Sequence, residues 1–313
     1  MQSRKTSADL WHQKPYYSLD AWCKNTYGRK LYKAALDIGC TCPNRDGTLD
    51  TRGCIFCSAG GSGDFAASRQ LSVTDQLNQA KALLSSKWTP EPGKPSLIAY
   101  FQAYTNTYGD PDRLLSCYEE ALSSPEVAGI SIATRPDCLS DIILEGLDRL
   151  RLLYPDRFIW IELGLQSIHD HTAARIRRGY PTSVFYDAAA KLHARRLPFI
   201  VHLILGLPGE TRLDLLESIR AVNQVHPFGV KLQLLHILKG TDLALLYEAG
   251  KLPVLTQEEY LDLLTSCIAA LSPDICLHRS PPAPDRAPVE SFETKRLKRA
   301  ACPYETTKSQ TRG

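Results

Sequence analysis

Residues 158–163 read FIWIEL, a nearly continuous run of large apolar side chains with two isoleucines and two aromatic rings. Such runs are typical of strands that are covered on both faces, as the strands of parallel sheets are. Five similar runs lie at residues 31–38, 96–102, 128–133, 199–205 and 230–237. The sequence therefore predicts six parallel strands.

Longer segments with apolar residues at helical spacing lie between these runs, at residues 73–88, 112–123, 140–154, 170–178 with 184–196, and 212–225. This alternation is expected of parallel strands joined by helical crossovers, so the fold class is α/β, with a parallel sheet or barrel. Two more helical segments, 241–248 and 257–271, follow the sixth strand.

The chain divides into four parts by this pattern. Residues 34–238 hold the strands and crossovers, and residues 239–280 form a C-terminal helical extension. Residues 1–33 are rich in basic and aromatic side chains. Residues 281–313 begin with four prolines by Pro288, followed by KRLKR, and this composition predicts a mobile tail.

Composition excludes several classes of protein. The 313 residues are 43% hydrophobic and 23% charged, as in folded globular proteins. No run of about 18 apolar residues and no apolar signal region occurs, so we expect a cytoplasmic protein with no membrane partner. In that compartment the 10 cysteines favour metal binding or redox chemistry over disulfides.

A cysteine-rich loop, residues 39–63, follows the first predicted strand and reads GCTCPNRDGTLDTRGCIFCSAGGSG. The carboxyl ends of parallel strands are where such folds place chemistry. The spacing Cys42-x11-Cys54-x2-Cys57 brings three thiolates within reach of one centre. Soft thiolates select zinc, copper(I) or iron–sulfur clusters.

The cysteines alone leave alternatives open. Cys40 adds a fourth thiol, so a closed zinc knuckle that only staples the loop is one of them. A thioredoxin-like pair at Cys54 and Cys57 is disfavoured, because the pair ends a long glycine-rich loop and does not begin a helix after a short turn.

The cysteine-rich loop is followed by five further motifs, which occur in a fixed order along the chain. TCPNRDG and GCIFCS are followed in order by AYFQAYTNTYG (99–109), ATRPDCL (133–139), IELGLQS (161–167) with RRGY (177–180), HLILGLPGET (202–211) and LLHILKGT (234–241). With these motifs the sequence resembles the radical S-adenosylmethionine (SAM) enzymes. Within them it is similar to the YhcC/YtqA-type group, which is related to the radical domain of the Elongator catalytic subunit.

The resemblance implies a partial (β/α)6 barrel like an incomplete TIM barrel, with extra C-terminal helices and a lateral opening. It implies that Cys42, Cys54 and Cys57 hold a 4Fe-4S cluster whose open iron binds SAM. One electron would then split SAM reductively and give a 5'-deoxyadenosyl radical. Phe56 either shields the cluster or packs within the loop. Cys40 departs from the pattern of the relatives.

The resemblance also implies the contacts to SAM. Glu162 and Gln166 would face the ribose and the methionine end, although Glu162 could instead form a structural salt bridge. Arg178 would bind the SAM carboxylate, and its neighbour Arg177 is the alternative, a solvated charge. The remaining expected contacts come from the strand ends at Gln102, Gly206 and Pro208. Residues 102–107 replace the Gly-Gly-Glu that is usual in the superfamily.

Five side chains on or just beyond the third, fifth and sixth strands are candidates for substrate handling and catalysis: Arg135, Cys138, His202, His236 and Lys239. Each also has a plain interpretation. A histidine in an apolar strand is more often a satisfied core residue, and Cys138 could be a radical relay or a small buried side chain.

The amino-terminal segment interleaves cations with rings, at Lys14, Tyr16, Tyr17, Trp22, Lys24, Tyr27, Arg29, Lys30, Tyr32 and Lys33. Such a mixture suits RNA binding, and the alternative is a helix that closes the bottom of the barrel. The Elongator relation favours a transfer RNA (tRNA) base as substrate, with flavodoxin or ferredoxin as electron donor. The other hypotheses are a small metabolite as substrate, or a zinc-stabilised RNA-binding module without catalysis.

Overall fold

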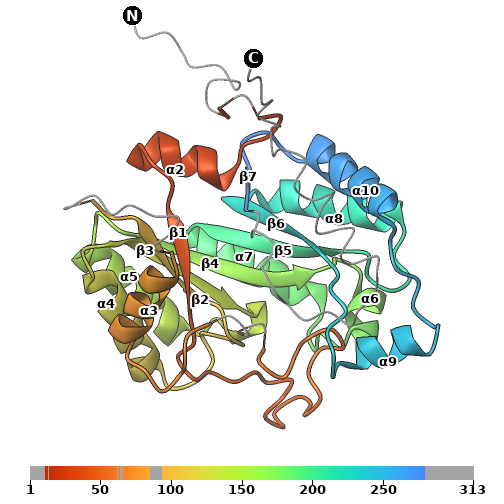
Figure 1. The fold of residues 1–313 in the computed structure, drawn as a ribbon, viewed down its shortest axis with the longest axis horizontal. Coiled ribbons are helices and arrows are strands. Elements are labelled where there is room, and N and C mark those ends of the chain that lie inside the picture. The colour runs from red at the N-terminus through yellow and green to blue at the C-terminus, as the bar shows by residue number, and fades with distance from the viewer. Residues whose placement is uncertain (1–10, 13, 62, 64–65, 85–93, 279–313) are drawn as a thin grey trace, which may run out of the picture.

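The computed structural model describes residues 11–12, 14–61, 63, 66–84 and 94–278. Its centre is one seven-stranded parallel sheet in the order β1-β2-β3-β4-β5-β6-β7. The strands are β1 (Tyr32–Leu36), β2 (Leu97–Phe101), β3 (Val127–Thr134), β4 (Phe158–Gln166), β5 (Phe199–Leu205), β6 (Gly229–Leu234) and β7 (Cys276–Leu277). The chain is therefore α/β, and the sheet curls into a partial barrel, as expected (Figure 1).

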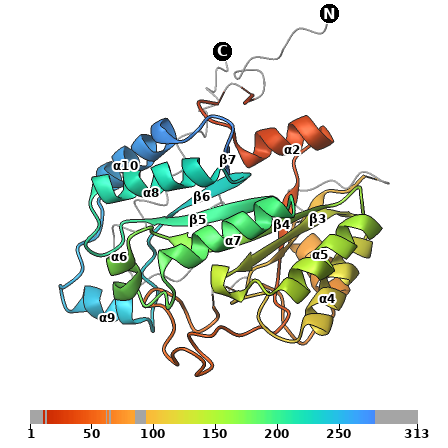
Figure 2. The ribbon, with the colours of Figure 1, turned by 180° about the vertical axis from the view of Figure 1, so that it is seen from behind.

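Helices cover the outer face of the sheet (Figures 1 and 2). They are α3 (Val73–Leu84), α4 (Pro111–Ser123), α5 (Asp141–Leu153), α6 (Asp170–Arg175), α7 (Thr182–Ala194) and α8 (Arg212–Val225). A short 3-10 helix, η1 (Pro136–Cys138), follows β3. Two further helices come after β6, α9 (Asp242–Glu248) and α10 (Gln257–Ala270), and α10 packs on α8.

Local sequence signals set several helix starts. Asp110 caps α4 with its side chain and is followed by Pro111, whose missing N–H is not needed in the first turn. Thr211 and Asp214 form a reciprocal capping box at α8, and Thr256 and Glu259 form one at α10. These bonds satisfy backbone donors that a helix leaves unpaired at its start.

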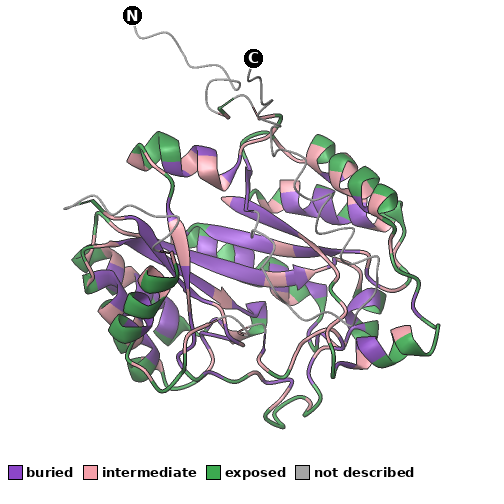
Figure 3. Cartoon of the chain, viewed as in Figure 1, coloured by how far each residue is buried: buried purple, intermediate pink, exposed green. Residues whose placement is uncertain are grey.

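Side chains alternate between the two faces of the strands. The outer set, such as Leu36, Ile132 and Leu163, is buried against the helices (Figure 3). On the inner face, a cluster of aromatic side chains fills the barrel at the amino-terminal ends of the strands. We call it the aromatic plug, and its members are Trp22, Tyr27, Phe158, Trp160 and Phe228.

The amino-terminal helix α2 (Leu19–Tyr27) closes this end of the barrel. Its Trp22 ring lies 4.9 Å from the Trp160 ring and 5.4 Å from the Phe158 ring, between ring centroids. The expectation that Trp22 and Tyr27 stack on RNA bases is therefore wrong, because the core occupies their rings. The alternative, a helix that closes the barrel, is what the structure shows.

The predicted and observed strands differ in number as well as in their ends. β7 and the bridge between Ser18 and Leu277 extend the predicted six-stranded sheet with residues of the C-terminal extension. The tail predicted at 281–313 lies outside the described residues, as does the end of the predicted helix 73–88. No helix in the described part combines the length and apolar character that a membrane span needs.

Candidate functional site

The cysteine loop leaves the carboxyl end of β1 and crosses the open end of the barrel, opposite α2 (Figure 1). Cys42, Cys54 and Cys57 are all half-buried there. Burial and the neighbouring thiols of Cys57 and Cys42 raise the pKa of Cys54 to about 12. The structure therefore brings the three predicted metal ligands together at one place.

Cys40 points elsewhere. Its side chain is 3% exposed and belongs to the apolar core between sheet and helices. Burial raises the pKa of the Cys40 thiol to about 11, and Arg113 and Cys117 are among its neighbours. The four cysteines of the loop do not converge, so they do not form a zinc knuckle.

The three remaining thiols are not among the described sets of ligand atoms that all lie within 4.8 Å of one another. Zn–S bonds of about 2.3 Å place two sulfurs of one site within about 4.6 Å of each other. In the described part of the chain, the only set of three potential ligand atoms that all lie within 4.8 Å of one another is that of His169, Asp214 and Glu217. Three soft thiolate donors are also the ligand type of iron–sulfur clusters.

Two residues of the CPNRDG motif hold the loop in shape. Asn44 Nδ2 donates to the carbonyls of Arg177 and Arg178, at 2.8 and 3.0 Å, and lies 3.6 Å from Cys54 Sγ. Arg45 donates to the carbonyls of Cys57 and Ser58, each at 2.7 Å. Sequence reasoning did not single out these two side chains, although their places between Cys42 and Cys54 were a signal.

The RRGY motif supplies the opposite wall of the site. Gly179 has φ of +84°, a backbone conformation that other residues rarely adopt. A Cβ at this position would also lie only 2.4 Å from Asn44 Oδ1, so both the backbone and the available space require glycine. Arg177 donates to the carbonyl of Gly53 at 2.9 Å and forms a 2.5 Å ion pair with Asp242. Arg177 is thus bonded to the cysteine loop and is not a solvated charge.

Arg135 lies beside the first of the three thiols. Its guanidinium makes a two-pronged pair with Asp137 at 2.9 and 2.7 Å and stacks over the Tyr180 ring at 4.9 Å. Its remaining nitrogen donates to the carbonyl of Arg178 at 3.0 Å and lies 3.9 Å from Cys42 Sγ. Arg135 thus places a fixed cation beside the Cys42 sulfur.

Arg178 is buried, with 1% exposure, and its donors are engaged. They bond to the carbonyls of Leu165 (2.7 Å), Ser167 (2.6 Å) and Tyr180 (3.2 and 3.1 Å), and to Thr182 Oγ1 (2.9 Å). These contacts tie the end of β4 to the segment before α7. They give Arg178 a scaffold role, and its contact with SAM stays a prediction.

The other expected SAM contacts lie where the strands end. Gln102 and Gln166 are half-buried next to the ends of β2 and β4, and Gln166 has φ of +62°. Gly206 and Pro208 form the turn after β5, in which the Pro208 carbonyl accepts from Arg175 at 2.8 Å. Gly206 borders a cavity of about 240 Å³ between this turn and α10. Their roles toward SAM stay predictions.

Glu162 lies deeper than expected. Its side chain is fully buried, in the middle of β4. Lys33 Nζ and Ser131 Oγ each lie 2.6 Å from Oε1, and His202 Nε2 lies 2.7 Å from Oε2. The structural ion pair considered as the alternative for Glu162 is thus present.

The contact between Lys33 and Glu162 also shows that the sheet is strongly curved. Lys33 is on β1 and Glu162 on β4, three strands away, so a flat sheet would hold their strands about 14 Å apart. Their side chains nevertheless meet at 2.6 Å. The inner face is therefore concave, and polar groups from distant strands converge in it.

The remaining catalytic candidates are not gathered into one group. Burial and Asp137 raise the pKa of Cys138, on η1, to about 12. A thiol in that position stays protonated at neutral pH. His236 and Lys239 are exposed in the segment between β6 and α9. Their roles in catalysis stay predictions.

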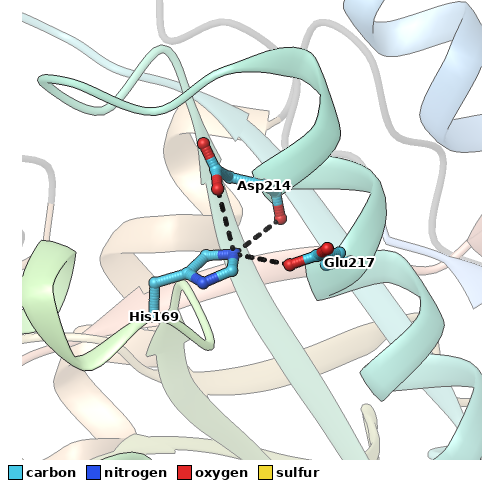
Figure 4. Close-up of side chains that lie close together, drawn as sticks. All are labelled: His169, Asp214 and Glu217. Carbon is cyan, nitrogen blue, oxygen red and sulfur yellow. Dashed lines mark hydrogen bonds and ion pairs between the residues drawn. The ribbon is translucent and has the colours of Figure 1, made fainter.

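A histidine that the sequence did not single out lies on the outside of the rim, at the start of α8. His169 Nε2 is 3.1 Å from the Asp214 backbone oxygen, 3.7 Å from Asp214 Oδ1 and 3.6 Å from Glu217 Oε2 (Figure 4). Asp214 also completes the capping box with Thr211. The ring therefore fastens the loop after β4 to the first turn of α8.

Comparison with known families decides the identity of this arrangement. The sequence profile described as "Radical SAM superfamily" matches residues 42–222, which is more than half of the chain and includes all three thiols. This chain belongs to the radical SAM superfamily. A second profile, the radical SAM C-terminal domain, matches residues 227–291. The radical SAM chain is an enzyme whose cofactors are a 4Fe-4S cluster and SAM.

Several proteins are similar to this radical SAM chain along much of its length. YtqA of Bacillus subtilis is 40% identical over 267 residues, 85% of this chain and 81% of that protein. YhcC of Escherichia coli K12 is 36% identical over 256 residues, 81% of this chain and 79% of that protein. Elongator complex protein 3 of Bos taurus is 24% identical over 153 residues, 46% of this chain and 26% of that protein.

Solved structures of the superfamily share the fold. An archaeal Elp3 from Methanocaldococcus infernus superposes with a TM-score of 0.60 at 16% identity, over 86% of this chain and 62% of that chain. The chain thus spans about three fifths of that protein. Methylornithine synthase PylB superposes with a TM-score of 0.51 at 13% identity, over 96% and 93% of the two chains. At these identities the likeness shows the fold alone.

Proposed function

We propose that Cys42, Cys54 and Cys57 hold the 4Fe-4S cluster and that the chain uses it to generate a 5'-deoxyadenosyl radical from SAM. The observation that carries this assignment is the convergence of three thiols without the fourth, because Cys40 is committed to the core. Three protein ligands leave one iron of a four-iron cluster without a protein donor. That position suits the amino and carboxylate groups of SAM.

The chain's own residues prepare this chemistry. When bound, the cluster supplies one electron to the SAM sulfonium, which yields methionine and the deoxyadenosyl radical. Asn44 and Arg45 fix the loop so that the thiols stay aligned. Arg135 sets a cation beside Cys42. Gln102, Gln166 and the Gly206 turn surround the open end of the barrel, where they would orient SAM.

Anaerobic reconstitution tests this proposal against the zinc-module alternative. We expect a brown protein with about four irons per chain that releases 5'-deoxyadenosine when it is reduced in the presence of SAM. Flavodoxin or ferredoxin should replace a chemical reductant in this assay. A colourless protein that keeps stoichiometric zinc after the same treatment would contradict the assignment.

We propose further that a tRNA base is the substrate. The support is the similarity to Elongator complex protein 3, which covers 46% of the chain, together with the basic amino-terminal segment. The rings of α2 do not contribute, since they lie in the aromatic plug. Lys24 and Lys30 are exposed, and although Lys24 forms a 2.9 Å ion pair with Asp20, we expect both ammonium groups to contact phosphates.

RNA binding is tested by charge removal, because truncating the first 33 residues would also remove α2 from the barrel. We expect affinity for tRNA to fall about 10³-fold between 50 and 200 mM salt if about six phosphates are contacted. The double variant Lys24→Gln, Lys30→Gln should lower the slope of this dependence by about two. Lys191→Gln, on the outer helix α7, is the matched control.

Two results would remove tRNA as the substrate. The first is binding that does not change with salt. The second is an unchanged set of modified nucleosides in total tRNA from cells that lack the gene. Neither result would affect the proposal of radical formation, which the reconstitution assay scores separately.

A further inference from the structure

The cation beside the cysteine loop, Arg135, is buried and fixed by its neighbours. It comes directly after β3, and its side chain is 10% exposed. Asp137 accepts from Nε at 2.9 Å and from Nη2 at 2.7 Å, and the guanidinium lies over the Tyr180 ring at 4.9 Å from the centroid. Because Nε and Nη2 form one edge of the planar group, these contacts set its orientation and leave Nη1 for other acceptors.

The free side of the Arg135 guanidinium meets the first thiol of the cysteine loop. Nη1 lies 3.9 Å from Cys42 Sγ and donates to the Arg178 carbonyl at 3.0 Å. The same carbonyl accepts from Asn44 Nδ2, also at 3.0 Å, and that amide lies 3.6 Å from Cys54 Sγ. One backbone carbonyl therefore places an N–H donor beside each of two thiols. Of these two donors, the one beside Cys42 carries a positive charge.

The donors of Arg135 that could hold a ligand anion are already engaged. A guanidinium binds a carboxylate best through two parallel N–H bonds, and Asp137 occupies the edge that makes them. Nη1 is shared between the Arg178 carbonyl and the Cys42 sulfur. These contacts favour a role that Arg135 exerts through Cys42 over direct contact with a substrate.

A charged N–H donor at a ligand sulfur acts on the reduction potential of an iron–sulfur cluster. The potential of such a cluster depends on its net charge, on hydrogen bonds to its sulfurs and on its exposure to solvent. Reduction adds one negative charge, so a fixed cation stabilises the reduced form more than the oxidised form. Arginine stays protonated in proteins, and a charge as buried as that of Arg135 is screened little by salt.

Asp137 has the opposite electrostatic effect. Its carboxylate fixes the guanidinium in place, yet its negative charge offsets part of the positive charge of Arg135. The two residues thus form one structural unit in which the two charges act in opposite directions on a cluster held by Cys42. This difference allows an electrostatic role to be separated from a structural one.

We propose that Arg135 is a positioning residue that raises the reduction potential of the cluster through its contact with Cys42, and that Asp137 limits this rise. The inference rests on the proposed radical function, because Cys42 must be a cluster ligand. In that function one electron passes from flavodoxin or ferredoxin to the cluster and then to the SAM sulfonium. The S–C5' bond breaks, which gives methionine and the 5'-deoxyadenosyl radical. A higher potential favours the first of these transfers.

A redox titration followed by electron paramagnetic resonance tests the proposal on the full-length, reconstituted protein. Arg135→Met removes the charge and the donors but keeps a long side chain. At any fixed potential we expect a ratio of reduced to oxidised cluster about tenfold lower, which is a shift of about 59 mV to more negative values for one electron. Arg135→Lys keeps the charge without the fork, so its potential should lie between those of Arg135→Met and the unaltered protein.

Asp137→Asn should shift the potential in the opposite direction, to less negative values. Asparagine keeps an oxygen acceptor for Arg135 but removes the offsetting charge. A purely structural role predicts shifts of the same sign in Arg135→Met and Asp137→Asn, because both variants break the same pair. The matched control is Arg151→Gln, since Arg151 at the end of α5 also bonds to a carboxylate and to the Arg195 carbonyl before β5. This variant should leave the potential unchanged.

Two results would overturn the proposal. The first is an Asp137→Asn protein whose potential falls or does not move, and this result decides even where Arg135→Met retains no cluster. The second is an Arg135→Met protein that keeps about four irons and an unchanged potential. Failure of the proposed function is distinguishable, because the unaltered protein would then hold no four-iron cluster or release no 5'-deoxyadenosine from SAM.

Discussion

Replacement of Cys42, Cys54 or Cys57 by serine is expected to abolish both cluster assembly and SAM cleavage. Each thiol is one of three protein ligands, and a serine hydroxyl is a hard donor that does not replace a soft thiolate. Iron should fall from about four per chain to near zero in each single variant, with loss of visible absorbance and of 5'-deoxyadenosine. Iron analysis and product assays after anaerobic reconstitution measure this.

Cys40→Ser is the matched control for this series, because it makes the same chemical change two residues from Cys42. The structure places Cys40 in the apolar core, so the variant should keep its iron and lose only about 1 kcal/mol of stability. If Cys40→Ser lost the cluster while Cys42→Ser retained it, the assignment of ligands would be wrong.

The sequence predicted the architecture well because buried parallel strands leave a strong local signal. The run at residues 199–205 coincides with β5, and the helix expected at 212–225 coincides with α8. β7 escaped prediction since two residues, Cys276 and Leu277, contain no periodic pattern. Its pairing with β6 depends on how the chain returns to the sheet, which no local pattern records.

The site was predictable where residue type alone limits the chemistry. The cysteine spacing pointed to the three thiols, but the sequence could not show that Cys40 faces the helices. The same ambiguity applied to Glu162. An acidic residue within an apolar strand must have partners, yet those partners, Lys33 and His202, lie on β1 and β5 and meet Glu162 only because the sheet curls.

Arginine roles were the hardest to predict. The pair Arg177 and Arg178 stands at the end of one motif, and the resemblance favoured Arg178 as the ligand of SAM and left Arg177 to solvent. In the structure Arg177 holds the cysteine loop and Arg178 is enclosed by carbonyls. Arg177 has a positive φ of +55°, so the chain turns there and the two side chains point in different directions. No residue type or helical periodicity in the sequence predicts this turn.

Arg178→Met should therefore be among the most destabilising single substitutions in the chain. Removing the guanidinium takes the Arg178 donors from the carbonyls of Ser167 and Tyr180, at about 1–3 kcal/mol for each buried group, whereas the Leu165 carbonyl keeps its bond from the Ser167 N–H at 2.8 Å. We expect the free energy of unfolding to fall by about 4 kcal/mol in denaturant titrations. Arg178→Lys should recover little, because one ammonium cannot reproduce the planar fork.

The exposed Arg220 on α8 provides the comparison, and Arg220→Gln should change stability by less than about 0.5 kcal/mol. Titrating SAM into the Arg178 variants separates the two roles of this residue. If Arg178 has a scaffold role, its variants should lose free energy of unfolding, and SAM binding should decrease only by the fraction of protein that is unfolded. A variant that keeps its full stability while losing SAM affinity would instead show that the Arg178 guanidinium leaves its carbonyls and binds the SAM carboxylate.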